Sequence, residues 1–252
     1  MSWAEINKKR LPFIRTGERV FAQMYRDIRN ALAKKLQNLT QPEQVIQQAR
    51  NFRMQEEGLK KYYEIFYFKT SIAFARDFQA KCGLPLLERK QEDIWEPKIK
   101  EYIRLNAGKK ITQLLRTAYE DIENITKKAV TKGIEEGWGM DKIAKEIIND
   151  LKDLDMWKAR RIARTEVVAA SNYGIKLGAE DLPGRKVKVW VSSFDTRSRE
   201  DHMAADGQRV AFEEMFEVGG EKLEYPGDPR GSAGNIINCR CGYEVILEGI
   251  LT

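Results

Sequence analysis

The sequence has little histidine and little cysteine: one histidine and three cysteines in 252 residues. It also has no apolar run near the roughly 18 residues that cross a bilayer. The first twenty residues contain Glu5 and a basic cluster at Lys8, Lys9 and Arg10, and they have no continuous apolar segment. This pattern excludes an ordinary secretory signal peptide. We therefore expect a protein without a membrane segment that folds in a cytoplasm.

The three cysteines are Cys82, Cys239 and Cys241. An odd count without regular spacing is not the disulfide framework of a secreted domain. Cys239 and Cys241 are too close in sequence for an unstrained disulfide between them, so we expect reduced thiols or metal ligands. Cys82 is expected to pack as a small apolar group near the end of a helix.

The positive charge is unevenly distributed. The net charge is +6, yet residues 185–252 hold 9 Lys and Arg against 12 Asp and Glu, and residues 1–184 hold 35 against 26. A basic surface on the first part of the chain would attract nucleic acid through its phosphates. Helices rich in Lys and Glu also carry such charge simply as a solvated face, so composition alone leaves DNA contact open.

Hydrophobic spacing predicts an α+β protein that is predominantly α, with an extended helical body followed by a small C-terminal α+β module. Apolar residues recur every three or four positions from residue 18 onward, with a loop expected at 106–108. After Pro183-Gly184, Val187, Val189 and Val191 alternate with Lys186, Lys188 and Trp190, which predicts a strand. Residues 195–205 are expected to be a helix with Asp195 as its N-cap. We divide the chain into an N-terminal helical region (1–107) for partner contact, a second helical region (108–182) and the module (183–252).

Five separated strings stand out in the second half of the chain. They are Arg161-Ile162-Ala163-Arg164-Thr165-Glu166 with Ala169-Ala170-Ser171-Asn172-Tyr173-Gly174; Trp190; Asp195-Thr196-Arg197-Ser198-Arg199-Glu200-Asp201-His202 with Asp206-Gly207-Gln208; Pro226-Gly227-Asp228-Pro229; and Asn238-Cys239-Arg240-Cys241. In this order the set resembles the head-morphogenesis domain of Mu F-like minor head proteins of tailed phages. The resemblance covers roughly residues 110 to 247.

The resemblance implies a protein present in few copies in the virion, inside the capsid near the portal, after assembly in the host cytoplasm. Its implied partners are the portal protein, capsid proteins and packaged double-stranded DNA, with a role in head assembly or genome ejection. The residues that carry the resemblance are expected to form a structural motif. They are Arg164, Glu166, Asn172, Trp190, Asp195, Arg197, His202, Asp206, Gly207, Asn238 and Arg240.

The one histidine lies in this motif. If the last strand lies beside the predicted short helix, His202 can meet Cys239 and Cys241, and with Asp195 these residues offer ligands acceptable to zinc. Asp195, Arg199, His202 and Asp206 recur at intervals of four, three and four and would share one helix face. The cysteines are separated by one residue, fewer than in ordinary zinc motifs. Packing of His202 and two buried thiols without metal is therefore the favoured interpretation, with no cofactor expected.

Three alternatives stay open. Arg160 and Arg161, with Arg164, are candidates for a ridge that contacts DNA phosphates, although packing is the favoured role of this helix. The chain could instead be a DNA-binding accessory protein without capsid contact. A metal-dependent hydrolase or toxin is the third alternative. A Cys/His pair can supply a thiol nucleophile, and Asp195, His202 and Asp206 could instead hold a divalent ion for phosphodiester cleavage. The sequence shows no phosphate-cradling glycine loop, so we expect a protein that is not an enzyme.

Overall fold

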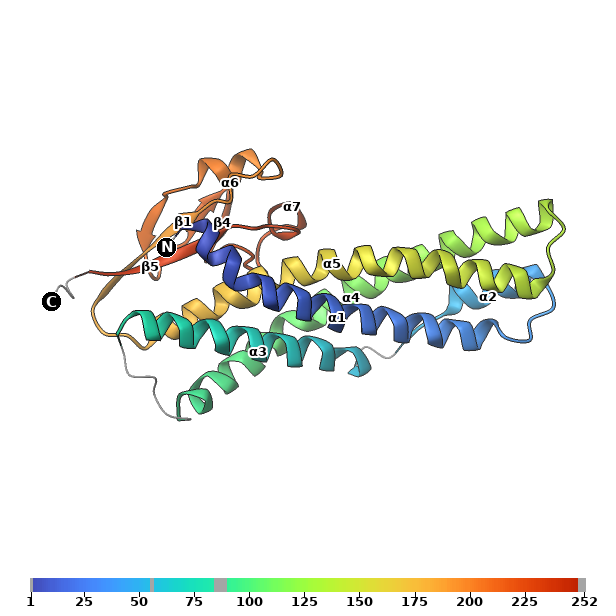
Figure 1. The fold of residues 1–252 in the computed structure, drawn as a ribbon, viewed down its shortest axis with the longest axis horizontal. Coiled ribbons are helices and arrows are strands. Elements are labelled where there is room, and N and C mark those ends of the chain that lie inside the picture. Colours follow the sequence, from blue (N-terminus) through green and yellow to red (C-terminus); the bar gives the residue numbers. More distant parts are fainter. Residues whose placement is uncertain (1, 55–56, 84–89, 249–252) are drawn as a thin grey trace.

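The chain folds into a long helical bundle with a small strand-containing module at one end (Figure 1). The computed structural model describes residues 2–54, 57–83 and 90–248. The bundle consists of α1 (Trp3–Leu36), α2 (Pro42–Asn51), α3 (Glu57–Lys81), α4 (Lys90–Glu135) and α5 (Met140–Glu180). The predicted class, predominantly α with a small α+β module, is confirmed.

The first helix begins earlier than its apolar spacing predicts. Ser2 caps it: the Ser2 side chain accepts a hydrogen bond from the Glu5 amide, and the Glu5 side chain accepts one from the Ser2 amide. This reciprocal cap satisfies two free amides of the first turn. Ile6 and Arg10 are buried, so the first turns also have an inward face. The apolar spacing did not predict this part of the helix, because one of its two buried residues, Arg10, is charged.

The prediction of a loop at residues 106–108 is wrong. α4 runs without a break through these positions, and the Asn106 side chain donates a hydrogen bond to the Tyr102 carbonyl one turn earlier. One glycine inside a helix costs about 1 kcal/mol, which packing of α4 against its neighbours offsets. The boundary drawn at 107/108 thus falls inside a continuous helix, and α1 and α3 from before it pack on α5 from after it.

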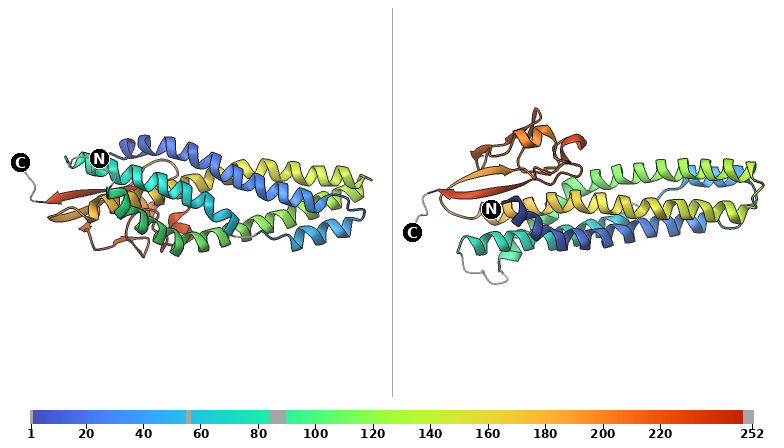
Figure 2. Two further views of the ribbon diagram at one scale, coloured as in Figure 1. Left: turned by 90° about the horizontal axis from the view of Figure 1, so that it is seen from below. Right: turned by 45° about the horizontal axis from the view of Figure 1, so that its top comes forward.

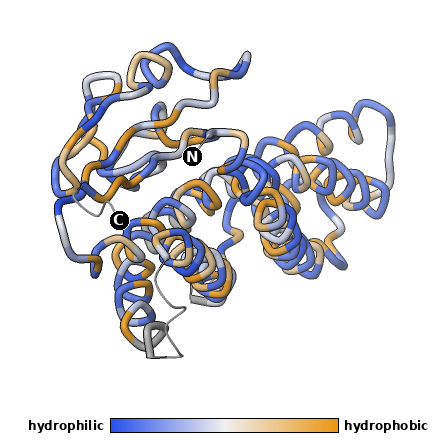
Figure 3. The backbone as a smooth tube through the Cα atoms, turned by 60° about the vertical axis from the view of Figure 1, so that its left-hand side comes forward, coloured by the Kyte–Doolittle hydropathy of each residue, from blue (hydrophilic) through white to orange (hydrophobic). Residues whose placement is uncertain are grey.

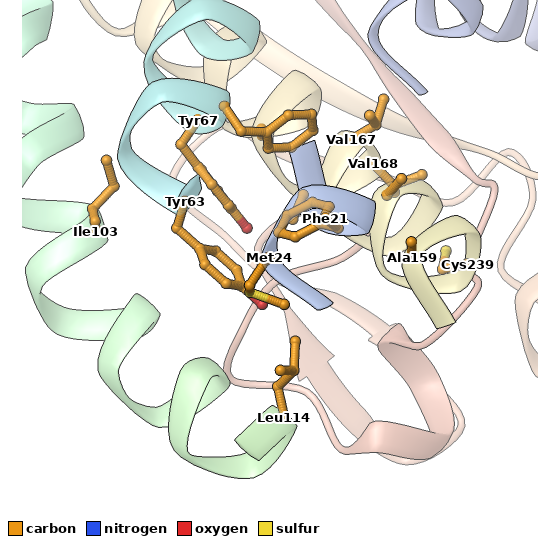
Figure 4. Packing of buried hydrophobic residues seen from close by; sticks show 14 of the residues in the cluster. Phe21, Met24, Tyr63, Tyr67, Ile103, Leu114, Ala159, Val167, Val168 and Cys239 are labelled. Atoms are coloured by element: carbon orange, nitrogen blue, oxygen red, sulfur yellow. The ribbon is translucent and has the colours of Figure 1, made fainter. Parts of the chain in front are cut away.

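The small residues of α5 let α3 approach closely. Gly174 and Gly178 lie against the backbone carbonyls of Ser71 and Ala75 of α3, leaving no space for a side chain at either position. Aromatic and aliphatic side chains from α1, α3, α4 and α5 fill the core between them (Figure 4). Along each helix apolar and hydrophilic stretches alternate, as expected where one face lies in a shared core (Figure 3).

The module is built on two small antiparallel sheets. β1 (Arg185–Val191) lies between β2 (Arg209–Ala211) and β5 (Gly242–Glu248), with Trp190 opposite Tyr243. β3 (Phe216–Val218) and β4 (Glu221–Leu223) form a hairpin whose turn, Gly219-Gly220, has positive φ at both residues. Such a turn strongly favours glycine. The short helices α6 (Glu200–Ala204) and α7 (Ala233–Ile236) complete the module, which stacks on one end of the bundle (Figure 2).

Candidate functional site

The candidate site is a buried cluster of one imidazole and two thiols inside the module. His202 comes from α6, and Cys239 and Cys241 come from the segment that enters β5; each is 2% exposed. His202 Nδ1 lies 3.6 Å from Cys239 Sγ and 3.4 Å from Cys241 Sγ. The convergence of these three residues, which the sequence left conditional on strand and helix lying together, is present in the structure.

The orientation of the imidazole is set by Asn235 on α7. The Asn235 side-chain amide donates to the Val218 carbonyl at 3.2 Å, so its Oδ1 faces His202 Nε2, also at 3.2 Å. Because Oδ1 can only accept, Nε2 carries a proton, and Nδ1 faces the two sulfurs. The Trp190 ring stands edge-to-face against the imidazole, with ring centroids 5.7 Å apart. The ring is therefore held from two sides.

The two thiols have different proton affinities. A hydrogen bond between them lowers the pKa of Cys241, and His202 lowers it further, although burial opposes both effects. The same hydrogen bond, together with burial, raises the pKa of Cys239 well above its ordinary value. The pair is thus arranged so that one sulfur can be a thiolate while the other keeps its proton.

Asp195 does not join this cluster. Its carboxylate pairs with the Arg240 guanidinium, and its Oδ1 accepts a hydrogen bond from the Arg197 amide at 2.9 Å. The ligand atoms gathered within 4.8 Å of one another belong to His202, Cys239 and Cys241. Asp195 therefore fixes the loop before α6 and holds the side chain of Arg240, the residue between the two cysteines in the sequence.

The expected helix over 195–205 is shorter than predicted. α6 spans Glu200–Ala204 and its N-cap is Arg199, so the prediction of Asp195 as N-cap is wrong. Asp195 and Arg199 precede the helix and cannot share a helix face with His202. The reason is local: Asp195 bonds the amide two residues on and the Ser198 hydroxyl, which favours a turn over a helix start. Arg199 instead donates to the Ile237 carbonyl at 2.6 Å.

Asp206 and Gly207 join α6 to the sheet. Asp206 Oδ1 accepts a hydrogen bond from the Ser192 amide at 2.7 Å, just after β1. Gly207, with φ of 73°, takes a left-handed conformation, and its amide donates to the Trp190 carbonyl. These two motif residues therefore position the backbone at the end of β1 relative to α6.

Arg164 and Glu166 of α5 line different hollows, because residues two positions apart lie on different sides of a helix. Glu166 is buried and accepts hydrogen bonds from the Tyr67 hydroxyl of α3 and from Lys110 Nζ of α4, the latter at 2.6 Å. Asn172 donates from its side chain to the Pro226 carbonyl at 2.6 Å, and its own backbone carbonyl accepts from the Tyr243 hydroxyl. α5 is thus the connection between bundle and module.

Asn238 closes the motif from the other side. Its backbone has a φ of 57°, and its amide donates to the Thr165 hydroxyl on α5 at 3.0 Å. This left-handed residue turns the chain so that Cys239 can point inward, and asparagine tolerates that conformation better than most residues.

Arg10 of α1 contacts the site, and the sequence analysis did not identify it. Its buried guanidinium donates to the carbonyl of Cys241 at 2.9 Å, to the Ser171 hydroxyl at 2.8 Å and to Asn172 Oδ1 at 2.6 Å. Burial lowers its pKa to about 10. Trp3 also donates from its indole to the Arg240 carbonyl at 3.1 Å. In the sequence Arg10 is one of three consecutive cations, and nothing local distinguishes it from a surface residue.

Beside the cysteine segment lies a hollow lined by several arginines. It is bounded by α1, α5 and the loop after β1; its charged lining residues are Arg10, Arg15, Glu18, Arg160, Arg164, Asp195, Arg197 and Arg240. Arg160 pairs with Glu18 at 3.3 Å, and Asp195 pairs with Arg240. The two acids do not balance six guanidinium groups. The hollow is therefore strongly positive.

Arg160 and Arg161 do not form a common ridge. Arg160 lines this hollow, whereas Arg161 lies over the Trp157 ring at 4.5 Å and lines a second hollow with Glu166. Neighbouring residues of a helix point about 100° apart, which explains the separation. Only Arg160 and Arg164 of the proposed set share one opening.

Comparison with known proteins places these observations in a family. Residues 124–244 match the profile of the family described as Phage Mu protein F like protein. The chain is also 28% identical over 158 residues to the uncharacterized protein YqbB of Bacillus subtilis (strain 168), covering 61% of this chain and 47% of that protein. It therefore spans about half the length of that relative. No solved structure matches significantly. Together these findings confirm the resemblance to Mu F-like proteins, and the matched residues 124–244 include the end of α4, all of α5 and the Cys/His cluster.

Proposed function

We propose that the protein is a minor head protein of a tailed phage, which acts in head morphogenesis next to the portal. The family match over 124–244 carries this proposal. The long bundle is consistent with this role, because α1 to α4 extend away from the module and offer helical surface to portal or capsid proteins. Among the described helices none combines the length and apolar character that a membrane crossing requires.

Analysis of phage particles tests this role. An epitope tag on the chain, introduced into its phage genome, should be found in purified heads in few copies per particle, and heads made without the gene should assemble aberrantly or lack infectivity. Cross-linking in those heads should join the bundle to the portal protein. Normal, infectious heads that contain none of the tagged chain would contradict the proposal.

We further propose that the arginine-lined hollow contacts the phosphates of packaged DNA. Arg164 and Arg197 line it, and neither makes an ion pair within the described part of the chain. Guanidinium groups bind phosphate oxygens through two parallel hydrogen bonds. The contact would be independent of sequence and would weaken as salt displaces it.

Titration of duplex DNA against salt tests this contact. Changing Arg164 or Arg197 to Gln should weaken binding for every duplex sequence and reduce the slope of log affinity against log salt by about 1 for each lost phosphate contact. Arg19→Gln, on the exposed face of α1, is the matched control and should leave the slope unchanged. Equal slopes in all variants would assign DNA contact to another surface or to none.

A catalytic role is not proposed. His202, Cys239 and Cys241 are each 2% exposed, and of the three only Cys239 lines the arginine hollow, so the Cys/His pair is not presented together to a substrate. Asp195 and Asp206 have structural partners, an arginine and a backbone amide, and do not converge with His202. The residue types that a hydrolase would use are therefore present, but the two aspartates do not lie together with His202.

A further inference from the structure

We propose that His202, Cys239 and Cys241 bind one Zn²⁺ ion, through Nδ1 and two thiolates, as a structural site that fastens the cysteine segment to α6. This inference is independent of the role in the phage head. It concerns the cluster that the sequence alone favoured as simple packing.

The two nitrogen–sulfur distances in the cluster are those of a tetrahedral zinc site. Zinc binds thiolate at ~2.3 Å and imidazole nitrogen at ~2.0–2.1 Å, so tetrahedral angles separate nitrogen from sulfur by about 3.5 Å and the two sulfurs by about 3.8 Å. Nδ1 lies 3.6 and 3.4 Å from the two sulfurs, and all three atoms lie within 4.8 Å of one another. An ion can enter with little movement of the side chains.

Hydrogen bonding satisfies this cluster less well than a metal does. Nδ1 can make one hydrogen bond, as donor or acceptor, yet two sulfurs face it at nearly equal distance. A bound cation would use Nδ1 and both sulfurs together. On binding, each ligand thiol that carries a proton releases it to solvent, and the imidazole keeps its Nε2 proton.

The second layer of contacts is that of a metal-bound histidine. Imidazole ligands usually donate their other N–H to an oxygen that fixes the ring and its tautomer. Asn235 Oδ1 is in that position, and its own amide is held by the Val218 carbonyl. Asn235 is therefore a positioning residue for the site, although it touches no metal.

The environment points to a structural ion. The three ligands are 2% exposed, and the backbone of Arg240 and Cys241 accepts hydrogen bonds from Trp3 and Arg10 of α1. Zinc there would join α6, the β5 entry and, through these carbonyls, the start of the bundle. The fourth ligand would be a water molecule or the Ser192 hydroxyl, which lies 3.9 Å from Cys241 Sγ.

Metal analysis of the full-length protein is the direct test. Protein produced with added zinc should contain one zinc ion per chain after gel filtration. Cobalt-loaded protein should show the intense visible bands of tetrahedral Co²⁺ and a sulfur-to-cobalt charge-transfer band. Metal-free protein whose thermal midpoint is the same with and without Zn²⁺ would overturn the proposal.

Matched variants locate the ion. Cys239→Ser and Cys241→Ser should each lose zinc and the charge-transfer band, whereas Cys82→Ser, which removes the half-buried thiol of the α3 end, should keep both. Asn235→Ala should keep the ligands but weaken zinc binding by roughly 10–100-fold, as for other residues of this second layer. Zinc retained at wild-type affinity in both cysteine variants would also overturn the proposal.

One further measurement separates loss of the ligand from loss of the fold. Circular dichroism and the thermal midpoint of each variant are compared with those of wild-type protein stripped of metal. Folded Cys241→Ser protein should resemble the stripped protein and gain no stability from Zn²⁺. If the cysteine variants unfold, the test rests on Asn235→Ala and on the spectrum of cobalt-loaded wild-type protein. Unchanged zinc affinity in Asn235→Ala, together with no sulfur-to-cobalt band in the wild-type protein, would count against the site.

Discussion

Arg10 on α1 donates a hydrogen bond to Asn172 on α5, from Nη2 to Oδ1, over 2.6 Å. Asn172 in turn contacts the module, because its side-chain amide donates a hydrogen bond to the Pro226 carbonyl. A cation near the start of the chain is thus bonded to a side chain that in turn holds a loop more than fifty residues further on. The module is held to the bundle by polar contacts of this kind as well as by apolar packing.

Replacing Arg10 by Met should destabilise the protein by roughly 2–4 kcal/mol, because buried acceptors lose a charged donor. Denaturant unfolding of the full chain measures this loss. Arg19→Met, on the exposed side of the same helix, should change the free energy of unfolding by less than about 0.5 kcal/mol. Equal effects from the two changes would show that the buried network contributes little.

Glu166 and Lys110 form a buried ion pair that also includes the Tyr67 hydroxyl. Glu166→Gln and Lys110→Met should each cost roughly 3 kcal/mol, since each leaves its partner charged and buried. The double variant should cost clearly less than the sum of the two. A double-mutant cycle measured by urea unfolding gives the interaction free energy, and strictly additive losses would contradict a coupled pair.

Gly174 and Gly58 are both helical glycines, and the structure predicts opposite effects for them. A Cβ at Gly174 would overlap the Ser71 carbonyl and lie 3.0 Å from Phe74 Cβ, so Gly174→Ala should cost 2 kcal/mol or more, a rough value for overpacking. Gly58 is exposed and has no neighbour within 4 Å, so Gly58→Ala should stabilise the protein by about 0.5–1 kcal/mol. Thermal unfolding of the two variants checks both signs.

Lys188 gives a prediction for alkaline pH. Its side chain is 1% exposed and donates to the Glu224 carbonyl, and burial lowers its pKa to about 8. An unfolded lysine keeps its proton up to about pH 10.4. Between these values the unfolded chain binds more protons, so this residue makes stability rise with pH.

Lys188→Met removes that contribution. Its stability relative to wild type should therefore be highest below pH 8 and should fall as pH rises from 8 to about 10. Urea unfolding across this range, with the exposed Lys222→Met as control, measures the difference. A difference between Lys188→Met and wild type that does not vary with pH would show that the buried amine titrates normally.

Much of the candidate site could be read from the sequence because its residues stand in short strings. The alternation of valines in β1, the double glycine of the β3–β4 turn and the small residues of α5 each predict local structure through a local physical cause. The Asn238–Cys241 string and His202 marked the two segments that meet. The helix expected over 195–205 failed because the Asp195 side chain competes for backbone amides, which a count of spacing does not include.

The sequence by itself determined most of the helix and strand patterns, the uneven charge and the resemblance that the family match over 124–244 confirms. Only the tertiary structure decided which charges are buried. Arg10, Lys110 and Lys188 look like surface cations in the sequence, yet each is held by acceptors from distant segments. It also decided that Cys239 and Cys241 face one imidazole and that Asp195 does not. Local patterns reflect the backbone of a few neighbouring residues, whereas a buried polar contact depends on which segments the folded chain brings together.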